Sequence, residues 1–337
     1  MPTDELEPID PETALEMYLS AREREIAQST LRAHRSRLGH FLRWCDEQDI
    51  DNLNVLTGRD IHEYRLWRRN EGDLSTSTEK TQMDTVRVFV RWLGTIDAVD
   101  GDLHAKVQSP TLTGGDNVRD VRVEADEAAS ILEYYSTYEY ASLSHVTIAL
   151  LWQTMMRRSA IRALDVDDYD SDEQYLHVEH RPETDTPVKN GEDGERYIAL
   201  RDDTCSLLDD WLANQRPDVT DEYGREPLLA TSQGRPHVNT IQKYVYGVTR
   251  PCIRGDGCPH DRSPEDCDAA QAVNRAYDCP SSVSPHAVRR GSITNHLNTE
   301  MPEEVVSDRA DVTKRVLELH YDRRSEQEKM EQRREYL

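Results

Sequence analysis

Residues 101–120 constrain the fold most, because the apolar periodicity of the chain stops there. This segment, GDLHAKVQSPTLTGGDNVRD, contains Pro110 and the pair Gly114-Gly115, which disfavour a continuous helix or strand. Periodic patterns lie on both sides of it. The chain has 337 residues, and domains commonly have about 100–200. We therefore expect one domain over residues 1–100, a linker over 101–121 and a second domain over 122–337.

The first domain has the pattern of a small bundle of four helices. Ser29 is the expected N-cap of the second helix. Leu31 and Leu38 follow at helical spacing and are expected to face a core. Thr57, with Asp60 three residues later, resembles a capping box that opens the third helix. The helices are expected over residues 11–24, 29–45, 57–70 and 75–96.

The second domain begins with an acidic helix near Arg122. HVTIALLWQTMM (145–156) is apolar on nearly all sides, which predicts a buried helix. YLHVEH (175–180) and RYIAL (196–200) have the composition of short strands, and KNGEDGE between them has turn chemistry. Helical patterns then continue to the C-terminus. The sequence therefore predicts a mostly α chain with a small antiparallel β-sheet, an α+β fold.

Charge gives a conflicting indication of the partner. The chain has 65 acidic and 41 basic residues and a net charge of −24, whereas proteins that bind nucleic acids usually have a basic footprint. However, only six of the basic residues are Lys, and Phe is scarce. An acidic, Lys-poor composition is typical of a halophilic protein, whose charge keeps it in solution where salt screening is severe. The acidity is then a response to the solvent and says little about the partner.

No run approaches the ~18 apolar residues of a membrane helix. The start, MPTDELEPID, lacks the basic and apolar regions of a signal peptide. We therefore expect a cytoplasmic protein with no membrane partner.

Residues 27–45 contain four Arg and two His but no acid, which is unusual in so acidic a chain. A helix with this pattern can contact a phosphate backbone through Arg side chains. It can equally present a solvated face that pairs with acidic neighbours. The segment alone does not decide between the two.

Four patterns in the second domain combine into a stronger signal. Arg157 follows the buried helix in TMMRRSAIRAL, and Lys189 lies in the expected hairpin turn. His286 and Arg289, in SPHAVRRGSITNHL, share one helical face, and Tyr321 follows in VLELHYDRR. Each pattern has an ordinary alternative, such as helix capping, solvation or packing. Their order and spacing along the chain make the combination more informative than any one pattern alone.

Together these residues resemble the tyrosine recombinase (lambda-type phage integrase) family. The family's first motif, roughly T-G-x-R-x-x-E-x-x-x-L, is matched by Thr154, Arg157 and Leu164. SPHAVRRGSITNHL resembles the second arginine motif throughout, and Tyr321 lies 32 residues after Arg289. The resemblance covers about residues 12–337. It implies an N-terminal helical core-binding (SAM-like) domain followed by the catalytic domain.

The resemblance implies a site-specific recombinase that cleaves and rejoins DNA through a 3′-phosphotyrosyl intermediate. Arg157 and Arg289 would hold the scissile phosphate, and Tyr321 would attack it. Lys189 would protonate the leaving 5′-oxygen, and His286 would assist proton movement. Catalysis of this kind requires no metal or other cofactor.

Double-stranded DNA is the expected partner, and the family exchanges strands as a tetramer. Residues 322–337 are amphipathic enough to dock on a neighbour, although a frayed, solvated helix explains them equally well. Phosphate contacts are expected from Arg32, Arg35, Arg43, Lys80, Arg87 and Arg91.

Three departures from the family pattern leave rival functions open. Met155 replaces the usual Gly, and Ala160 replaces an acidic residue that orients the first Arg, a role that Asp165 could take. The Gly-His that usually lies about nine residues before the Tyr is missing from SDRADVTK (307–314). A non-catalytic or weakened DNA-binding regulator is therefore one alternative. A type IB topoisomerase-like nicking-closing enzyme is another.

Four of the six cysteines lie in one insertion, residues 252–279, which is not part of the family pattern. Cys45 and Cys205 lie at apolar-periodic positions, so we expect them in the cores. The clustered thiols favour a structural zinc site, with unligated loop thiols as the alternative. The candidate ligands are Cys252, Cys258, Cys267, Cys279 and His260.

Overall fold

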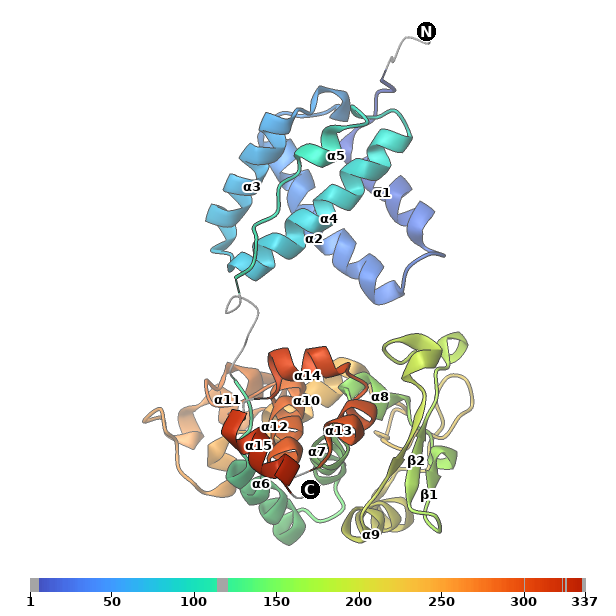
Figure 1. The fold of residues 1–337 in the computed structure, drawn as a ribbon, viewed down its shortest axis with the longest axis vertical. Helices are drawn as coiled ribbons and strands as arrows, with labels where there is room; N and C mark the ends of the chain where they lie inside the picture. The colour runs from blue at the N-terminus through green and yellow to red at the C-terminus, as the bar shows by residue number, and fades with distance from the viewer. Residues whose placement is uncertain (1–5, 114–120, 300, 323, 325, 335–337) are drawn as a thin grey trace. The chain divides into compact units, whose positions relative to one another are not determined.

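The structure is a computed structural model of the chain. It describes residues 6–113, 121–299, 301–322, 324 and 326–334. Two compact units divide at Arg119/Asp120, and each is described by itself (Figure 1). Within the described ranges, no helix has the length and apolar character needed to cross a membrane.

The first unit is a helical bundle around an aromatic core. Phe41, Tyr64 and Phe89 are completely buried, and the Phe41 and Tyr64 rings meet edge to face with centroids 5.1 Å apart, a favoured aromatic geometry. Its helices are α1 (Pro11–Arg22), α2 (Gln28–Glu47), the 3-10 turn η1 (Leu53–Val55), α3 (Gly58–Gly72), α4 (Thr76–Thr95) and α5 (Leu103–Lys106).

Most expected helix starts in this unit agree with the structure. The Thr57–Asp60 capping box is present at the start of α3, and Ser75 caps α4 through the Thr78 amide. The prediction that Ser29 caps α2 is wrong: the N-cap is Ala27, two residues earlier, and the helix begins at Gln28.

The segment expected to lack regular structure contains a short helix. Leu103 in α5 and the following Val107 are each 2% exposed or less and belong to the core of the first unit. Four residues are too few to show a helical period, so this element gave no sequence signal. The Gly114-Gly115 pair lies outside the described residues.

The second unit is mostly helical and has one three-stranded antiparallel sheet, as the sequence predicted. The sheet order is β1-β2-β3, with β1 (Tyr169–Asp170), β2 (Tyr175–Val178) and β3 (Arg196–Ala199). The last two are the expected strands. The two-residue β1 was missed because it is too short for an alternating pattern.

The helices of this unit surround α7, where nine of the twelve residues are buried, as expected for an all-apolar helix. They are α6 (Ala125–Tyr138), α7 (Leu143–Thr154), α8 (Arg158–Ala163), α9 (Asp202–Asp210, continued by a π turn Trp211–Gln215), α10 (Val238–Val248), α11 (Asp268–Gln271), α12 (Pro285–Asn298), α13 (Glu303–Ala310), α14 (Lys314–His320) and α15 (Glu326–Arg334). Short 3-10 turns join them: η2 (Val166–Asp168), η3 (Pro182–Thr184), η4 (Gly191–Gly194), η6 (Pro251–Arg254), η7 (Pro264–Asp266) and η8 (Val273–Asp278).

A close backbone contact holds α12 in place. A Cβ at Gly291 would lie 1.9 Å from the Val123 carbonyl oxygen, so this position requires glycine. The Ala287 carbonyl accepts the Val123 amide, 3.3 Å away. In Figure 1 the sheet lies on one side of the helices around α7 and α12, and the cysteine-rich segment with α11 lies on the opposite side.

Candidate active site

The break between α7 and α8 positions Arg157. Met155 ends α7 with a φ of 57°, a left-handed conformation, and the chain then turns so that Arg157 is the N-cap residue of α8. The Thr154 hydroxyl accepts the Met156 amide, 3.3 Å away. The usual glycine of the family motif therefore corresponds to a position where the backbone favours glycine.

Arg289, on α12, is the most deeply buried charge of the site, with 2% exposed. Its guanidinium donates to the carbonyls of Met155 and Ala310. Its Nε–H has no partner among the described residues. Burial, with the charge of Arg157, lowers the pKa of Arg289 to about 10. Such a buried, incompletely satisfied cation can stabilise an anion effectively.

Tyr321 follows α14 and lies against this arginine. Its side chain is 5% exposed, and its hydroxyl is within hydrogen-bonding reach of the Arg289 guanidinium. The Thr294 hydroxyl donates to the Tyr321 carbonyl, 3.1 Å away. The His286 ring meets the Tyr321 ring edge to face, with centroids 6.4 Å apart. Four of the five expected catalytic residues are thus brought together.

Lys189, the fifth, lies in the hairpin segment between β2 and β3, as expected. Its side chain is exposed, and its ammonium group has no hydrogen-bond or ion-pair partner among the described residues. A Cβ at Gly194 would lie 2.3 Å from the Lys189 carbonyl oxygen. The tight 3-10 turn after Lys189 therefore depends on this glycine.

Asp311 holds Arg157, and sequence reasoning missed it. Its carboxylate forms an ion pair with Arg157, its carbonyl accepts a second bond from that guanidinium at 2.8 Å, and Asn190 donates to it at 2.8 Å. The expectation that Asp165 could orient Arg157 is wrong. Asp165 lies in a separate network of ion pairs, with Arg181, Arg225 and Arg235.

Asp311 and Val312 occupy the place of the missing Gly-His. Asp311 has a φ of 49° and ends α13 in the left-handed region, where a glycine is usual. Val312, nine residues before Tyr321, packs partly buried against the apolar cluster that contains Met155 and Tyr321. An imidazole is therefore replaced by an apolar contact, and a glycine by a carboxylate.

Two further arginines enlarge the positive charge of the site. Burial lowers the pKa of Arg196 on β3. The charges of Arg157 and Arg309 lower it further, whereas the Asp311 carboxylate raises it. Burial also lowers the pKa of Arg309. Strands and helices far apart in sequence carry these residues, so only the tertiary fold could reveal them. Arg157, Arg196 and Arg289 thus lie within electrostatic reach of one another, and Arg309 lies near Arg196, a concentration of positive charge typical of an anion site.

The expected DNA-contacting residues of α2 are partly engaged with acids. Arg35 pairs with Glu16 at 2.9 Å, and Arg43 pairs with Glu71 at 3.4 Å. Arg32 is exposed and has no partner among the described residues. Arg35 and Arg43 thus pair with acidic neighbours, the alternative that the sequence had left open.

On α4, Lys80 and Arg87 both pair with Asp84, at 2.6 and 2.7 Å. Arg87 also donates to the Val107 carbonyl at 2.7 Å, so part of its role is to hold the segment after α5. Arg91 is exposed and makes no such contact within the described part of the chain.

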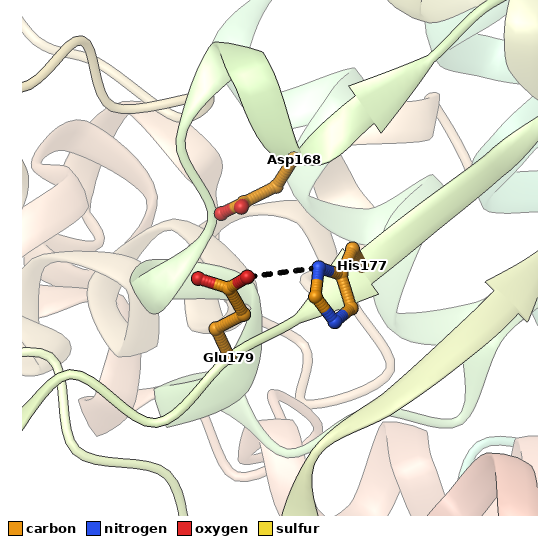
Figure 2. A group of neighbouring side chains, drawn as sticks. All are labelled: Asp168, His177 and Glu179. Atoms are coloured by element: carbon orange, nitrogen blue, oxygen red, sulfur yellow. Dashed lines mark ion pairs between the residues drawn. The ribbon is translucent and has the colours of Figure 1, made fainter.

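One group has the geometry of a metal site. The ligand atoms of Asp168, His177 and Glu179 lie within 4.8 Å of one another. Figure 2 shows the three side chains and the ion pair between two of them, in which His177 Nδ1 is 3.0 Å from Glu179 Oε1. However, both carboxylates already pair with Arg181. Because the guanidinium supplies the cation, we assign this group to a structural ion-pair network.

The cysteines follow the expected division. Cys45 and Cys205 are buried, which confirms their place in the two cores. The other four, with His260, line one cavity in the segment after α10.

The fold defines the class of protein. A structure of the Tn1549 transposon integrase in complex with a circular intermediate DNA is 13% identical, with a TM-score of 0.67 over 98% of this chain and 100% of that chain. A lambda integrase dimer bound to a COC′ core site is 15% identical, with a TM-score of 0.58 over 96% of this chain and 77% of that chain. The fold is therefore that of the tyrosine recombinases.

Sequence comparison gives the family. The phage integrase family matches residues 121–311, more than half of the chain, and the phage integrase N-terminal SAM-like domain matches residues 15–95. The chain belongs to the phage integrase family. The N-terminal domain of a phage integrase/site-specific recombinase from Haloarcula marismortui is 36% identical over 31% of this chain and 99% of that chain, with a TM-score of 0.30. No curated protein matches the chain.

Proposed function

We propose that the protein is a site-specific DNA recombinase that cleaves and rejoins DNA through a phosphotyrosyl intermediate. The observation that carries this proposal is the gathering of Arg157, Arg196 and Arg289 around Tyr321. The chain has a net charge of −24. Positive charge concentrated near one tyrosine in such an acidic chain favours an anionic ligand, and a DNA phosphate fits this requirement.

The residues of the site account for each bond and proton in cleavage of the strand. The Tyr321 oxygen attacks phosphorus, and the bond from phosphorus to the 5′-oxygen breaks with its electron pair on that oxygen. Arg157 and Arg289 stabilise the negative charge on the non-bridging oxygens. The phenol proton leaves through His286 or solvent. Attack by a 5′-hydroxyl on the 3′-phosphotyrosine then reverses every step and rejoins the strand.

Lys189 protonates the 5′-oxygen as it leaves. Its position in the hairpin segment, without a partner in the described residues, leaves the ammonium group able to move onto a bound strand. If this role is correct, Lys189→Ala should recover cleavage on DNA with a 5′-thiolate leaving group, which needs no proton. Failure of this rescue would assign the proton to another group.

Binding of DNA also requires the Asp311 carboxylate to release the Arg157 guanidinium. This carboxylate occupies the guanidinium that would hold a phosphate oxygen. A phosphate and a carboxylate compete for the same donors, so binding exchanges one for the other. This competition, together with Val312 in place of the usual His, favours one second candidate: a relative that binds DNA and cleaves it slowly or not at all.

Duplex DNA is the proposed partner of both units. Arg32 and Arg91 are ready to contact phosphates, and the paired arginines of α2 and α4 would exchange their carboxylates for them. Strand exchange would require self-association on DNA, a tetramer in this family.

A covalent-trapping experiment tests the function. The full chain is incubated in concentrated KCl with a library of nicked suicide duplexes of random sequence, and Tyr321 peptides carrying a nucleotide are sought by mass spectrometry. We expect an adduct in the wild type and in the control Tyr138→Phe, an exposed tyrosine of α6, and none in Tyr321→Phe.

The remaining outcomes separate the rivals. DNA binding with no adduct on any substrate would refute cleavage and indicate a non-catalytic regulator. An adduct accompanied by relaxation of supercoiled DNA, but without junction formation, would indicate a topoisomerase-like enzyme.

A further inference from the structure

The cysteine-rich segment lacks a hydrophobic core of its own. Between Pro251 and Ser284 only Ala269 and Ala276 are buried. Two methyl groups bury too little apolar surface to hold more than thirty residues in place. Segments of this kind are usually held by disulfides or by a metal. The structure has no disulfide among these cysteines.

Four thiols and one imidazole surround a single small cavity. Its volume is about 10 Å³, roughly the space for one water-sized occupant. The thiols come from four separate positions in the segment. The residues are Cys252 in η6, Cys258, His260, Cys267 before α11 and Cys279 after η8.

Donor groups surround the sulfur of Cys267. The Ala270 and Ala269 amides and the Arg262 side chain lie against it. Such donors are the usual outer contacts of a metal-bound ligand. Cys252 lies within electrostatic reach of Cys279 and Cys258.

The charges beside the cavity fit a metal–thiolate centre. A divalent ion with four thiolates has a net charge of about −2. Arg250 and Arg262 line the same cavity and can balance that charge. Arg250 is only 5% exposed and is fixed by donating to the Gly247 carbonyl at 3.1 Å and the Ala270 carbonyl at 2.9 Å.

We infer that Cys252, Cys258, Cys267 and Cys279 bind one Zn²⁺ ion in a tetrahedral structural site. Zinc suits an all-thiolate, tetrahedral ligand set. His260 is placed outside the ligand set because four thiolates complete a tetrahedral shell, and its Nε2 is 2.9 Å from the Ser281 hydroxyl. No three of these ligand atoms lie within 4.8 Å of one another, so binding of the ion requires the cysteine side chains to rotate towards the cavity.

The ion would fix the approach to α12. Cys279 lies six residues before Pro285, the first residue of α12, and the Val283 amide donates to the Thr249 hydroxyl at 3.0 Å. Zinc would thus join the end of α10 to the start of the helix that carries His286 and Arg289. It would take no part in the chemistry there.

The test is metal analysis of the purified full chain. We expect about one zinc per chain, loss of it in the double variant Cys258→Ser/Cys267→Ser, and retention in His260→Ala and in the control Cys205→Ala. Because the double variant can fail to fold, the wild type is also treated with a mercurial thiol reagent. This should release one equivalent of zinc to a metal-sensitive dye.

The contrary results are equally clear. A wild type without metal, or with iron in place of zinc, overturns the inference. Zinc that is lost in His260→Ala but kept in the double cysteine variant overturns the ligand set. These measurements need no DNA, so failure of the zinc site and failure of the recombinase proposal are separate results.

Discussion

Two residues in place of family glycines explain much of the local geometry of the site. Met155 has a φ of 57° and Asp311 a φ of 49°, so both are left-handed. This conformation costs a non-glycine residue roughly 1–2 kcal/mol. The reason for a glycine at each position is therefore the backbone: Met155 directs the chain into Arg157, and Asp311 directs it from α13 towards α14 and Tyr321.

Restoring glycine at Met155 should nevertheless destabilise the protein. The change relieves about 1 kcal/mol of strain, but it removes a side chain that is 0% exposed, which costs about 2–5 kcal/mol. We expect a net loss of about 1–4 kcal/mol in chemical denaturation. Asp73→Gly is the matched control, since Asp73 also has a positive φ, 44°, but is exposed. It should be neutral or stabilising. An unchanged or raised stability of Met155→Gly would contradict the argument.

Restoring glycine at Asp311 should strengthen DNA binding. Asp311→Gly removes the carboxylate that occupies Arg157 and relieves the left-handed strain. A charged hydrogen bond is worth about 1.5–3 kcal/mol, so DNA should bind about 10- to 100-fold more tightly, measured by fluorescence anisotropy with the Tyr321→Phe background. Asp308→Asn on the exposed side of α13 is the control. Weaker binding of Asp311→Gly would show that Asp311 positions Arg157 and does not compete with phosphate.

At the scale of helices and strands, the sequence predicted the elements with a strong period or a capping signal. The buried helix α7 and the Thr57–Asp60 capping box are examples. Elements of two to four residues, β1 and α5, show no period and were missed. Ala27 caps α2 without a side-chain bond, because the neighbouring serine lies inside the helix.

The candidate site was predictable in part for the same reason. The order of Arg157, Lys189, His286, Arg289 and Tyr321 is a sequence property. The ion pair between Arg157 and Asp311 joins residues 154 positions apart, and Arg196 reaches the site from a strand. These contacts depend on how α8, β3 and α13 pack, which no local pattern contains.

A buried histidine at the start of α7 should make this unit sensitive to acid. Burial lowers the pKa of His145 to about 4; its ring stacks on Tyr135 and meets Tyr140 edge to face, and its Nδ1 accepts the Ala141 amide at 3.3 Å. The unfolded chain binds the proton near pH 6.5. Below that pH the unfolded state therefore takes up more protons, and stability falls until about pH 4.

The expected size of this effect is measurable. Between about pH 6.5 and pH 5 the wild type should lose about 2 kcal/mol more unfolding free energy than His145→Gln, because glutamine accepts the same amide without titrating. Denaturant titrations at the two pH values, with hydrogen exchange of the α7 amides, give the difference. Equal losses in the two proteins would show that His145 is not the acid-sensitive group.

At the scale of the whole molecule, the acidic residues and the arginines of the site serve different purposes. The net charge is −24, yet the guanidinium groups of Arg157, Arg196 and Arg289 gather at the site that contains Tyr321. Affinity that rests on diffuse positive charge falls steeply with salt, whereas buried guanidinium groups are screened less. A protein that acts on DNA in concentrated salt would need this second arrangement, and its acidic surface would serve solubility.

This division predicts that salt stabilises the fold. Like charges on an acidic surface repel one another and favour expansion, and the Debye length falls from about 10 Å at 0.1 M salt to about 3 Å at 1 M. The thermal midpoint of the full chain should therefore rise with KCl. Sucrose does not screen charge, so the same low concentrations of sucrose should not reproduce this rise. Charge repulsion is strongest in dilute buffer, so the steepest rise is expected there. A midpoint that is flat or falls with KCl would show that the acidic surface does not oppose folding, and the halophilic interpretation of the composition would be wrong.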